Sequence, residues 1–146
     1  MLLRNRKRFD ELMACLRDDD PCVAMRAADV AEKITRGRPD WLQPYKEQLL
    51  TLLADAAQIE VRWHLALMLP RLRLTLAERH GAAEILQMYL HDRSSIVKTC
   101  AMQGLADLAR QDGSLKHLVL DILHSLTRTG TPAMRARGRI LLKQLK

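Results

Sequence analysis

Aromatic side chains are scarce in this chain of 146 residues. It contains two tryptophans, two tyrosines and one phenylalanine, and its apolar content is mostly leucine, alanine and methionine. β-Sandwiches depend on aromatic and β-branched residues, whereas small and unbranched apolar residues suit close packing between helices. The composition therefore favours an all-α fold, and no segment has the alternating pattern of a strand.

Cysteine is equally sparse. Cys15, Cys22 and Cys100 show neither a CxxC spacing nor a regular pairing. An odd number of cysteines without a disulfide pattern is typical of a reducing compartment. We expect each of the three to be a small buried apolar residue rather than a metal ligand or a nucleophile.

Long apolar runs are absent, and no stretch approaches the roughly 18 residues that a membrane span requires. The first residues, Met-Leu-Leu-Arg-Asn-Arg-Lys-Arg, become charged at once and contain no apolar core of a signal peptide. We therefore expect a cytoplasmic protein without a membrane span.

Catalytic and metal-binding motifs are also missing. The sequence has no GxGxxG, P-loop, GxSxG or paired-carboxylate motif. Its histidines form neither an HxxxH nor an HExxH pattern; they are His64, His80, His91, His117 and His124. His117 and His124 can share a helix face, but we recognise no carboxylate at a suitable interval. The sequence predicts no enzyme, no cofactor, no metal site and no small-molecule substrate.

What the sequence does have is an internal repeat. Four sets of apolar residues follow the spacing i, i+4, i+7, i+8, i+11, and each set indicates one face of a helix. The sets begin at Val23, Val61, Val97 and Met134, which are 38, 36 and 37 residues apart. A second amphipathic segment precedes each set. The pattern predicts about eight helices in one domain over 1–146, with repeats at about 5–36, 41–74, 79–110 and 114–145.

Turn residues agree with this division. Asp20, Ser94 and Thr131 stand where the second helix of a pair should begin, and each has a side chain suited to an N-cap. Asp40 is a plausible N-cap for the first helix of the second repeat. Pro70 is expected to kink or end the helix that contains it.

The repeat resembles that of the HEAT family. A HEAT unit has an aspartate near the turn between helices A and B, followed by an apolar-basic pair on helix B. The matching residues are Asp20 with Met25-Arg26, Asp55 with Val61-Arg62, and Asp92 with Val97-Lys98, while Met134-Arg135 lacks the aspartate. The resemblance covers nearly the whole chain. It implies a right-handed α-α superhelix of four helix pairs, with the B helices on the concave side.

The resemblance is almost silent on activity, because HEAT arrays serve many tasks. With no catalytic motif present, the favoured hypothesis is a non-enzymatic scaffold that binds a protein partner through its concave surface. The residues assigned to that surface are Arg62, Trp63 and Lys98. A more remote alternative is a HEAT-like alkylpurine DNA glycosylase, in which Trp63 would stack on a base. Trp63 can equally pack with Leu67 between helices, and those enzymes use longer arrays.

The basic residues after each anchor allow two interpretations. Because equivalent positions of stacked repeats line up in space, Arg62, Lys98 and Arg135 can form a ladder of positive charge along the groove. Alternatively, the resemblance implies that such a basic residue pairs with the aspartate of the same or the next repeat, and the spacing permits the pairs Asp19–Arg26, Asp55–Arg62 and Asp92–Lys98. Arg135 is the exception, because its repeat lacks the aspartate. Trp41 is expected to pack at a junction between repeats.

The charge balance leads to the alternative function. The chain has 24 basic and 17 acidic residues, a net charge of +7 and an estimated pI of 9.8. Six basic residues and no acidic one lie between 128 and 146, and Arg4, Arg6, Lys7 and Arg8 form a second patch. These patches indicate a nucleic-acid binder or merely a solvated face. The candidate anion-binding residues are Arg135, Arg137, Arg139, Lys143, Arg6 and Lys7.

Overall fold

The computed structural model describes residues 6–146, with side chains from Lys7 onward, and this part of the chain is helical throughout. It contains eight α-helices and four short 3-10 helices, and no strand occurs in residues 6–146. The all-α class and the expected number of helices are therefore confirmed. The chain divides into two compact units, residues 1–72 and 73–146, each of which holds two helix pairs.

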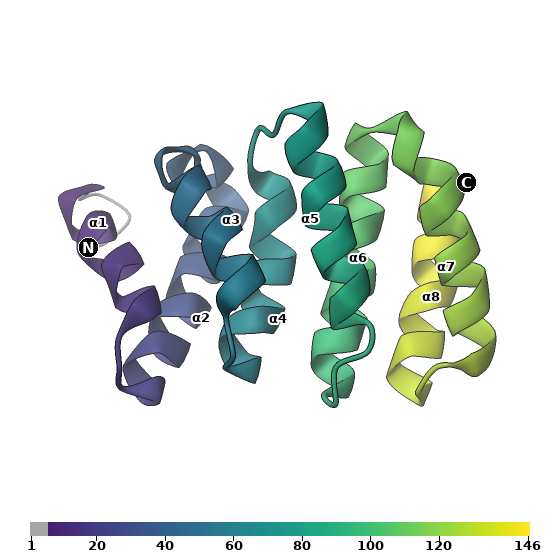
Figure 1. Ribbon diagram of the computed structural model, residues 1–146, viewed down its shortest axis with the longest axis horizontal. Helices are drawn as coiled ribbons and strands as arrows, with labels where there is room; N and C mark the ends of the chain where they lie inside the picture. Colours follow the sequence, from purple (N-terminus) through teal and green to yellow (C-terminus); the bar gives the residue numbers. More distant parts are fainter. Residues whose placement is uncertain (1–5) are drawn as a thin grey trace. The chain divides into compact units, whose positions relative to one another are not determined.

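In the first unit, the second helices of the two pairs, α2 and α4, pack side by side (Figure 1). Its elements are α1 (Arg6–Ala14), η1 (Cys15–Arg17), α2 (Pro21–Gly37), η2 (Pro39–Tyr45), α3 (Lys46–Asp55), α4 (Ile59–Met68) and η3 (Leu69–Arg71). The ring of Phe9, which is fully buried, contacts Trp41 and Tyr45 edge to face at centroid distances of 5.3 and 5.7 Å. Since Phe9 belongs to the first pair and Trp41 to the second, Trp41 packs at the junction between repeats, as predicted.

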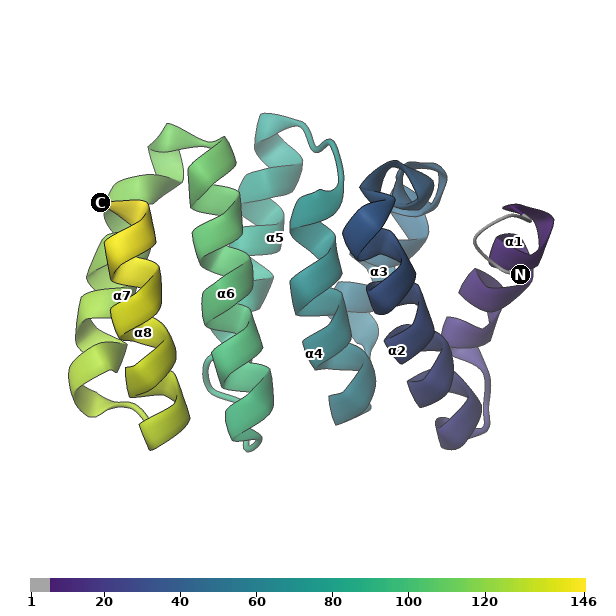
Figure 2. The same ribbon diagram turned by 180° about the vertical axis from the view of Figure 1, so that it is seen from behind.

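The second unit has the same organisation. Its elements are α5 (Leu76–Tyr89), α6 (Ser95–Gln111), η4 (Gly113–Leu115), α7 (Lys116–Thr129) and α8 (Pro132–Leu145). Within this unit α5 and α7 form one layer and α6 and α8 another, as the front and back views show (Figures 1 and 2). Helix α8 packs against both α6 and α7. The contact with α7 is close, because a Cβ added at Gly138 would lie 2.1 Å from Thr127 Oγ1.

The predicted starts of the three long B helices are confirmed. The side chain of Asp20 accepts a hydrogen bond from the Cys22 N–H at 2.9 Å. Ser94 and Thr131 accept from the third residue of their helices, Val97 and Met134, each at 3.3 Å. These local contacts satisfy backbone donors that the first turn of a helix leaves unpaired. Pro70 also acts as expected, since α4 ends at Met68 and continues as the 3-10 turn η3.

Two helix starts differ from the sequence analysis. Asp40 caps no α-helix: it lies in the 3-10 segment η2, which begins at Pro39 and contains Pro44, and α3 begins only at Lys46. The capping box at the start of α5 was missed. There Thr75 Oγ1 accepts from the Glu78 N–H at 3.1 Å, and the Glu78 carboxylate accepts from the Thr75 N–H at 2.8 Å.

The apolar sets of α4, α6 and α8 are buried almost completely, as predicted. In α2 the predicted face is partly wrong, because Val23, Val30 and Ile34 are only half-buried. The buried stripe of α2 instead includes two polar residues, Glu32 at 2% and Thr35 at 0% exposure. The stripe is displaced because Glu32 and Thr35 contact an arginine from the next repeat.

The cysteines also differ from expectation, since none of the three is buried. Cys22 is exposed at the start of α2, Cys15 and Cys100 are half-buried, and no disulfide joins them. Over residues 6–146, none of the helices combines the length and the apolar character needed to cross a membrane.

Candidate functional site

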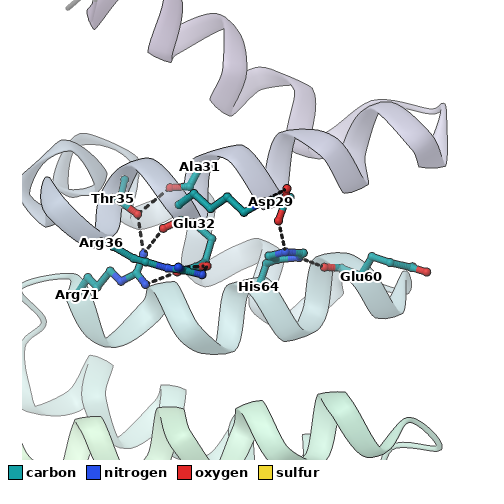
Figure 3. A network of polar contacts seen from close by, with 9 residues as sticks. Asp29, Ala31, Glu32, Thr35, Arg36, Glu60, His64 and Arg71 are labelled. Carbon is teal, nitrogen blue, oxygen red and sulfur yellow. Dashed lines mark hydrogen bonds and ion pairs between the residues drawn. The ribbon is translucent and has the colours of Figure 1, made fainter. Parts of the chain in front are cut away.

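The most heavily buried charge in the described part of the chain is the carboxylate of Glu32, on α2. Arg36, one turn later, donates from Nε to both carboxylate oxygens at 2.9 and 3.1 Å, and from a terminal nitrogen at 2.5 Å. Arg71 approaches the same carboxylate from the next repeat, at 2.5 Å from Oε2. Figure 3 shows both guanidinium groups converging on Glu32. We call Glu32, Thr35, Arg36 and Arg71 the Glu32 cluster.

The position of Arg71 follows from the end of α4. Pro70 lacks the N–H that would continue the helix, so the chain turns into η3 and carries Arg71 toward α2. One terminal nitrogen of Arg71 then donates to the Glu32 carbonyl and to Thr35 Oγ1, both at 2.8 Å. Thr35 Oγ1 donates in turn to the Ala31 carbonyl at 2.8 Å. Both polar side chains that α2 buries, Glu32 and Thr35, therefore have hydrogen-bond partners.

The electrostatics of the cluster favour an ionised carboxylate. Burial raises the pKa of Glu32, but hydrogen bonds from Arg36 and Arg71 lower it by more, so the pKa lies below its ordinary value of 4.5. A carboxylate held ionised between two guanidinium groups is a poor proton donor and is closed to substrate. The geometry assigns the cluster to holding α2 against α4 and η3.

A second contact joins the same two helices. His64, which is 2% exposed on α4, has Nδ1 against the carbonyl of Glu60 and Nε2 3.4 Å from Asp29 Oδ1 on α2. Lys33 Nζ contacts the other oxygen of Asp29 at 2.8 Å. The hydrogen bond from Lys33 is the main reason that the pKa of Asp29 is lowered. No histidine or aspartate was predicted to bridge repeats in this way.

In the second unit, polar side chains link α6 to α8 at intervals of about one repeat. Ser95 and Thr131 share a hydrogen bond of 2.8 Å between their hydroxyl oxygens. Farther along, Arg137 donates to Gln103 Oε1 at 3.1 Å, and Arg110 donates to Gln144. The paired positions are 36, 34 and 34 residues apart. The spacing found in the sequence thus corresponds to physical neighbours within this unit.

The residues predicted for the concave surface fall in different units. Arg62 is half-buried on α4, where its Nε donates to the Ala56 carbonyl at 2.7 Å. The Trp63 ring stacks on His64 with centroids 3.5 Å apart, so one ring face is already covered. Lys98 is half-buried in the first turns of α6. Arg62 and Trp63 thus belong to the first unit and Lys98 to the second, and each is described within its own unit.

The ion pairs that the HEAT-like spacing predicts do not form in the described residues. No bridge joins Asp19 to Arg26, Asp55 to Arg62, or Asp92 to Lys98. The aspartates at helix starts serve the backbone instead: Asp92 accepts from the Ser94 N–H at 2.9 Å, as Asp20 does from Cys22. One carboxylate oxygen of each is thus used by the turn that precedes its helix.

The basic residues predicted on the last helix are all exposed. Arg135, Arg139 and Lys143 have no acidic partner in the described part of the chain, whereas Arg137 donates to Gln103. At the other end Lys7 is exposed on α1. The Arg6 side chain lies outside the described residues.

A serine, a histidine and an aspartate meet in the second unit, but not as a catalytic triad. Ser114 Oγ donates to Asp112 Oδ1 at 2.6 Å, and His80 Nε2 lies 2.9 Å from the same hydroxyl oxygen. Because the hydroxyl proton points to Asp112, His80 must donate to Ser114 rather than accept from it. Hydrogen bonds from Ser114 also lower the pKa of Asp112, which stays ionised. The arrangement caps η4 and activates no nucleophile.

The histidines of α7 do have a carboxylate at a suitable interval, contrary to the expectation from the sequence. His117 Nε2 lies 3.5 Å from Asp121 Oδ2. Asp121 is one turn beyond His117 and three residues before His124, a spacing that the sequence analysis overlooked. Both groups of the pair are highly exposed, and residues 6–146 contain no group of three ligand-type side chains placed to hold a metal ion.

A scan against protein-family models finds no match to this chain, and a search of curated proteins finds no relative.

Proposed function

We propose that the chain is a non-enzymatic, HEAT-like scaffold: a right-handed superhelix of four helix pairs that binds a protein partner on its B helices. The observation that carries the proposal is the linkage of consecutive B helices at equivalent positions. In the first unit, Gln58 at the start of α4 donates to the Pro21 carbonyl at the start of α2, 37 residues earlier. In the second, Ser95 and Thr131 make the corresponding contact between α6 and α8.

Because the contacts join equivalent positions of neighbouring B helices, they support a regular array of helix pairs with a shared binding surface. Within each unit the second helices of the two pairs pack against each other, α2 on α4 and α6 on α8, and in a superhelix of such pairs the other side of the B helices would stay open to a partner. Arg62 and Lys98 occupy corresponding positions, each the fourth residue of its helix, Trp63 follows Arg62, and all three are half-exposed. Half-exposed arginine, tryptophan and lysine side chains suit a protein partner, because arginine and tryptophan are enriched among residues that dominate binding energy.

Site-specific cross-linking tests the surface directly. A photoactivatable amino acid at Lys98 should give a discrete cross-linked protein in cells, whereas the same group at His124, exposed on α7, should not. Replacing Arg62 and Trp63 with alanine should abolish the cross-link at Lys98 while the circular dichroism spectrum stays unchanged. Equal cross-linking from both positions, or no effect of the substitutions, would rule out this surface.

A further inference from the structure

Three basic residues form a row on α8. Arg135, Arg139 and Lys143 follow one another every four residues, all are exposed, and no acidic residue lies between 128 and 146. Four residues of helix rise by about 6 Å, so the row presents three positive groups at nearly regular steps on a straight support. We call these three residues the α8 row.

The α8 row is separate from the contacts that hold α8 in place. The buried side of α8 contains Met134, Gly138, Leu141 and Leu145. Arg137, which donates to Gln103 of α6, lies on one flank of that side. At 100° per residue, the row lies on the opposite flank. Removing its charges should therefore leave the packing of α8 intact.

The chemistry of the row fits phosphate. Arginine donates two parallel hydrogen bonds to phosphate oxygens, and lysine adds a point charge. α8 contains no aromatic residue on which an unpaired base could stack. Its apolar side is buried in the unit, and Ile140, which is 49% exposed, is a single residue rather than an apolar face that could enter a lipid layer. These features favour the regular backbone of a duplex over a single strand or a membrane.

We propose that the α8 row binds the phosphate backbone of duplex nucleic acid without reading its sequence. The inference goes beyond the scaffold function, because it assigns a nucleic-acid ligand to the α8 row, of which only Arg135 stands at a position equivalent to Arg62 and Lys98. Each neutralised phosphate contributes about −0.9 to the slope of log affinity against log salt, so three contacts give about −2.7. Between about 50 and 200 mM salt, the affinity should then fall by roughly 40-fold.

The test is fluorescence anisotropy of a labelled mixed-sequence DNA duplex with three purified full-length proteins. They are the wild type, the row variant R135Q/R139Q/K143Q, and the control variant R17Q/R26Q/R93Q. The control removes the same charge from exposed arginines elsewhere. Thermal unfolding of each protein verifies that the fold survives.

The proposal predicts that the row variant loses at least tenfold in affinity and most of its salt dependence, while the control stays within about threefold of the wild type. Equal losses in both variants would show that only net charge matters and would overturn the proposal. So would the absence of duplex binding at about 50 mM salt, or stronger binding to a single strand or to phosphatidylserine vesicles.

Discussion

The first and last B helices, α2 and α8, both carry several basic residues but use them in opposite ways. On α2, Lys33 pairs with Asp29 and Arg36 with the buried Glu32. On α8, the three arginine and lysine side chains of the row face solvent without an acidic partner in the described residues. The cause is visible in the sequence: on α2 an acidic residue stands one turn before two of the three basic residues, Lys33 and Arg36, and α8 contains no acidic residue.

The same difference extends to the two units. Residues 1–72 hold 12 basic and 11 acidic residues, and residues 73–146 hold 12 basic and 6 acidic ones. The net charge of +7 is therefore concentrated in the second unit. Positive charge that is already paired stabilises the protein, while unpaired charge is available to a partner. Apart from Arg62, which belongs to the proposed partner surface, the comparison predicts that charge changes at paired residues of the first unit affect stability and that those on α8 affect binding.

The largest effect is expected from Glu32→Ala. It removes the carboxylate on which Arg36 and Arg71 converge and leaves Arg71 without its charge partner at a site that is 19% exposed. Breaking one side of a buried ion pair costs about 3 kcal/mol of the free energy of unfolding. Urea denaturation measures the loss. Glu84→Ala, on the exposed face of α5, is the matched control and should change stability by less than about 0.5 kcal/mol.

A smaller loss is expected from Gly138→Ala, which tests whether packing rather than charge holds α8. The new Cβ would lie 2.1 Å from Thr127 Oγ1 and 3.4 Å from the Met102 side chain, so the Thr127 side chain or the helices must move. Overpacking of this kind costs about 2 kcal/mol. Thr127→Ala removes the nearest atom and should restore most of the loss. A double-mutant cycle with no coupling would contradict the close approach of α7 and α8.

Loss of a neutral hydrogen bond should lower the free energy of unfolding by less than Glu32→Ala or Gly138→Ala does. Thr75→Ala removes one half of the capping box of α5 and should lower the free energy of unfolding by about 1 kcal/mol. Thr129→Ala removes a hydroxyl that bonds only within α7 and serves as the control. If Thr75→Ala lowered the free energy of unfolding as much as Glu32→Ala, buried ion pairs would not stabilise the protein more than surface hydrogen bonds, and the comparison would be contradicted.

The contribution of the Glu32 cluster to stability should also appear in the pH dependence of the free energy of unfolding. Because the pKa of Glu32 is lower in the folded protein than its ordinary 4.5, the cluster stabilises fully above that value. The contribution is lost as the pH falls from about 4.5 through the folded pKa. The wild type should therefore lose more stability than Glu32→Gln over this interval, measured by urea denaturation. Parallel pH profiles of the two proteins would show that the carboxyl is not shifted.

Sequence reasoning succeeded where the interaction is local. Asp20, Ser94 and Thr131 cap helices through atoms two or three residues away, and Pro70 ends α4 by lacking an N–H. The repeat spacing predicted the helix pairs for the same reason, because the apolar periodicity of each helix lies within one short stretch of sequence. Asp40 failed because its neighbouring prolines favour a 3-10 segment over an α-helical first turn.

The Glu32 cluster was not predicted because its partners are far apart in the chain. Arg71 lies 39 residues beyond Glu32, and a carboxylate on a helix is ordinarily taken as exposed. The predicted ion pairs erred in the opposite direction. They assumed that a suitable spacing brings charges together, although Asp92 is held by its own turn and Asp19 and Arg26 stay exposed. For the α8 row the sequence was sufficient, since a run of basic residues without an acid can have no local partner.

The comparison between the two helices is tested most directly by making the same change in each region and measuring the free energy of unfolding. Arg71→Met removes a guanidinium bonded to the Glu32 carboxylate and carbonyl, and Arg139→Met removes an exposed one from α8. We expect a loss of about 2–3 kcal/mol for Arg71→Met and less than about 0.5 kcal/mol for Arg139→Met. Equal changes in the two variants would contradict the assignment of one charge cluster to stability and the other to binding.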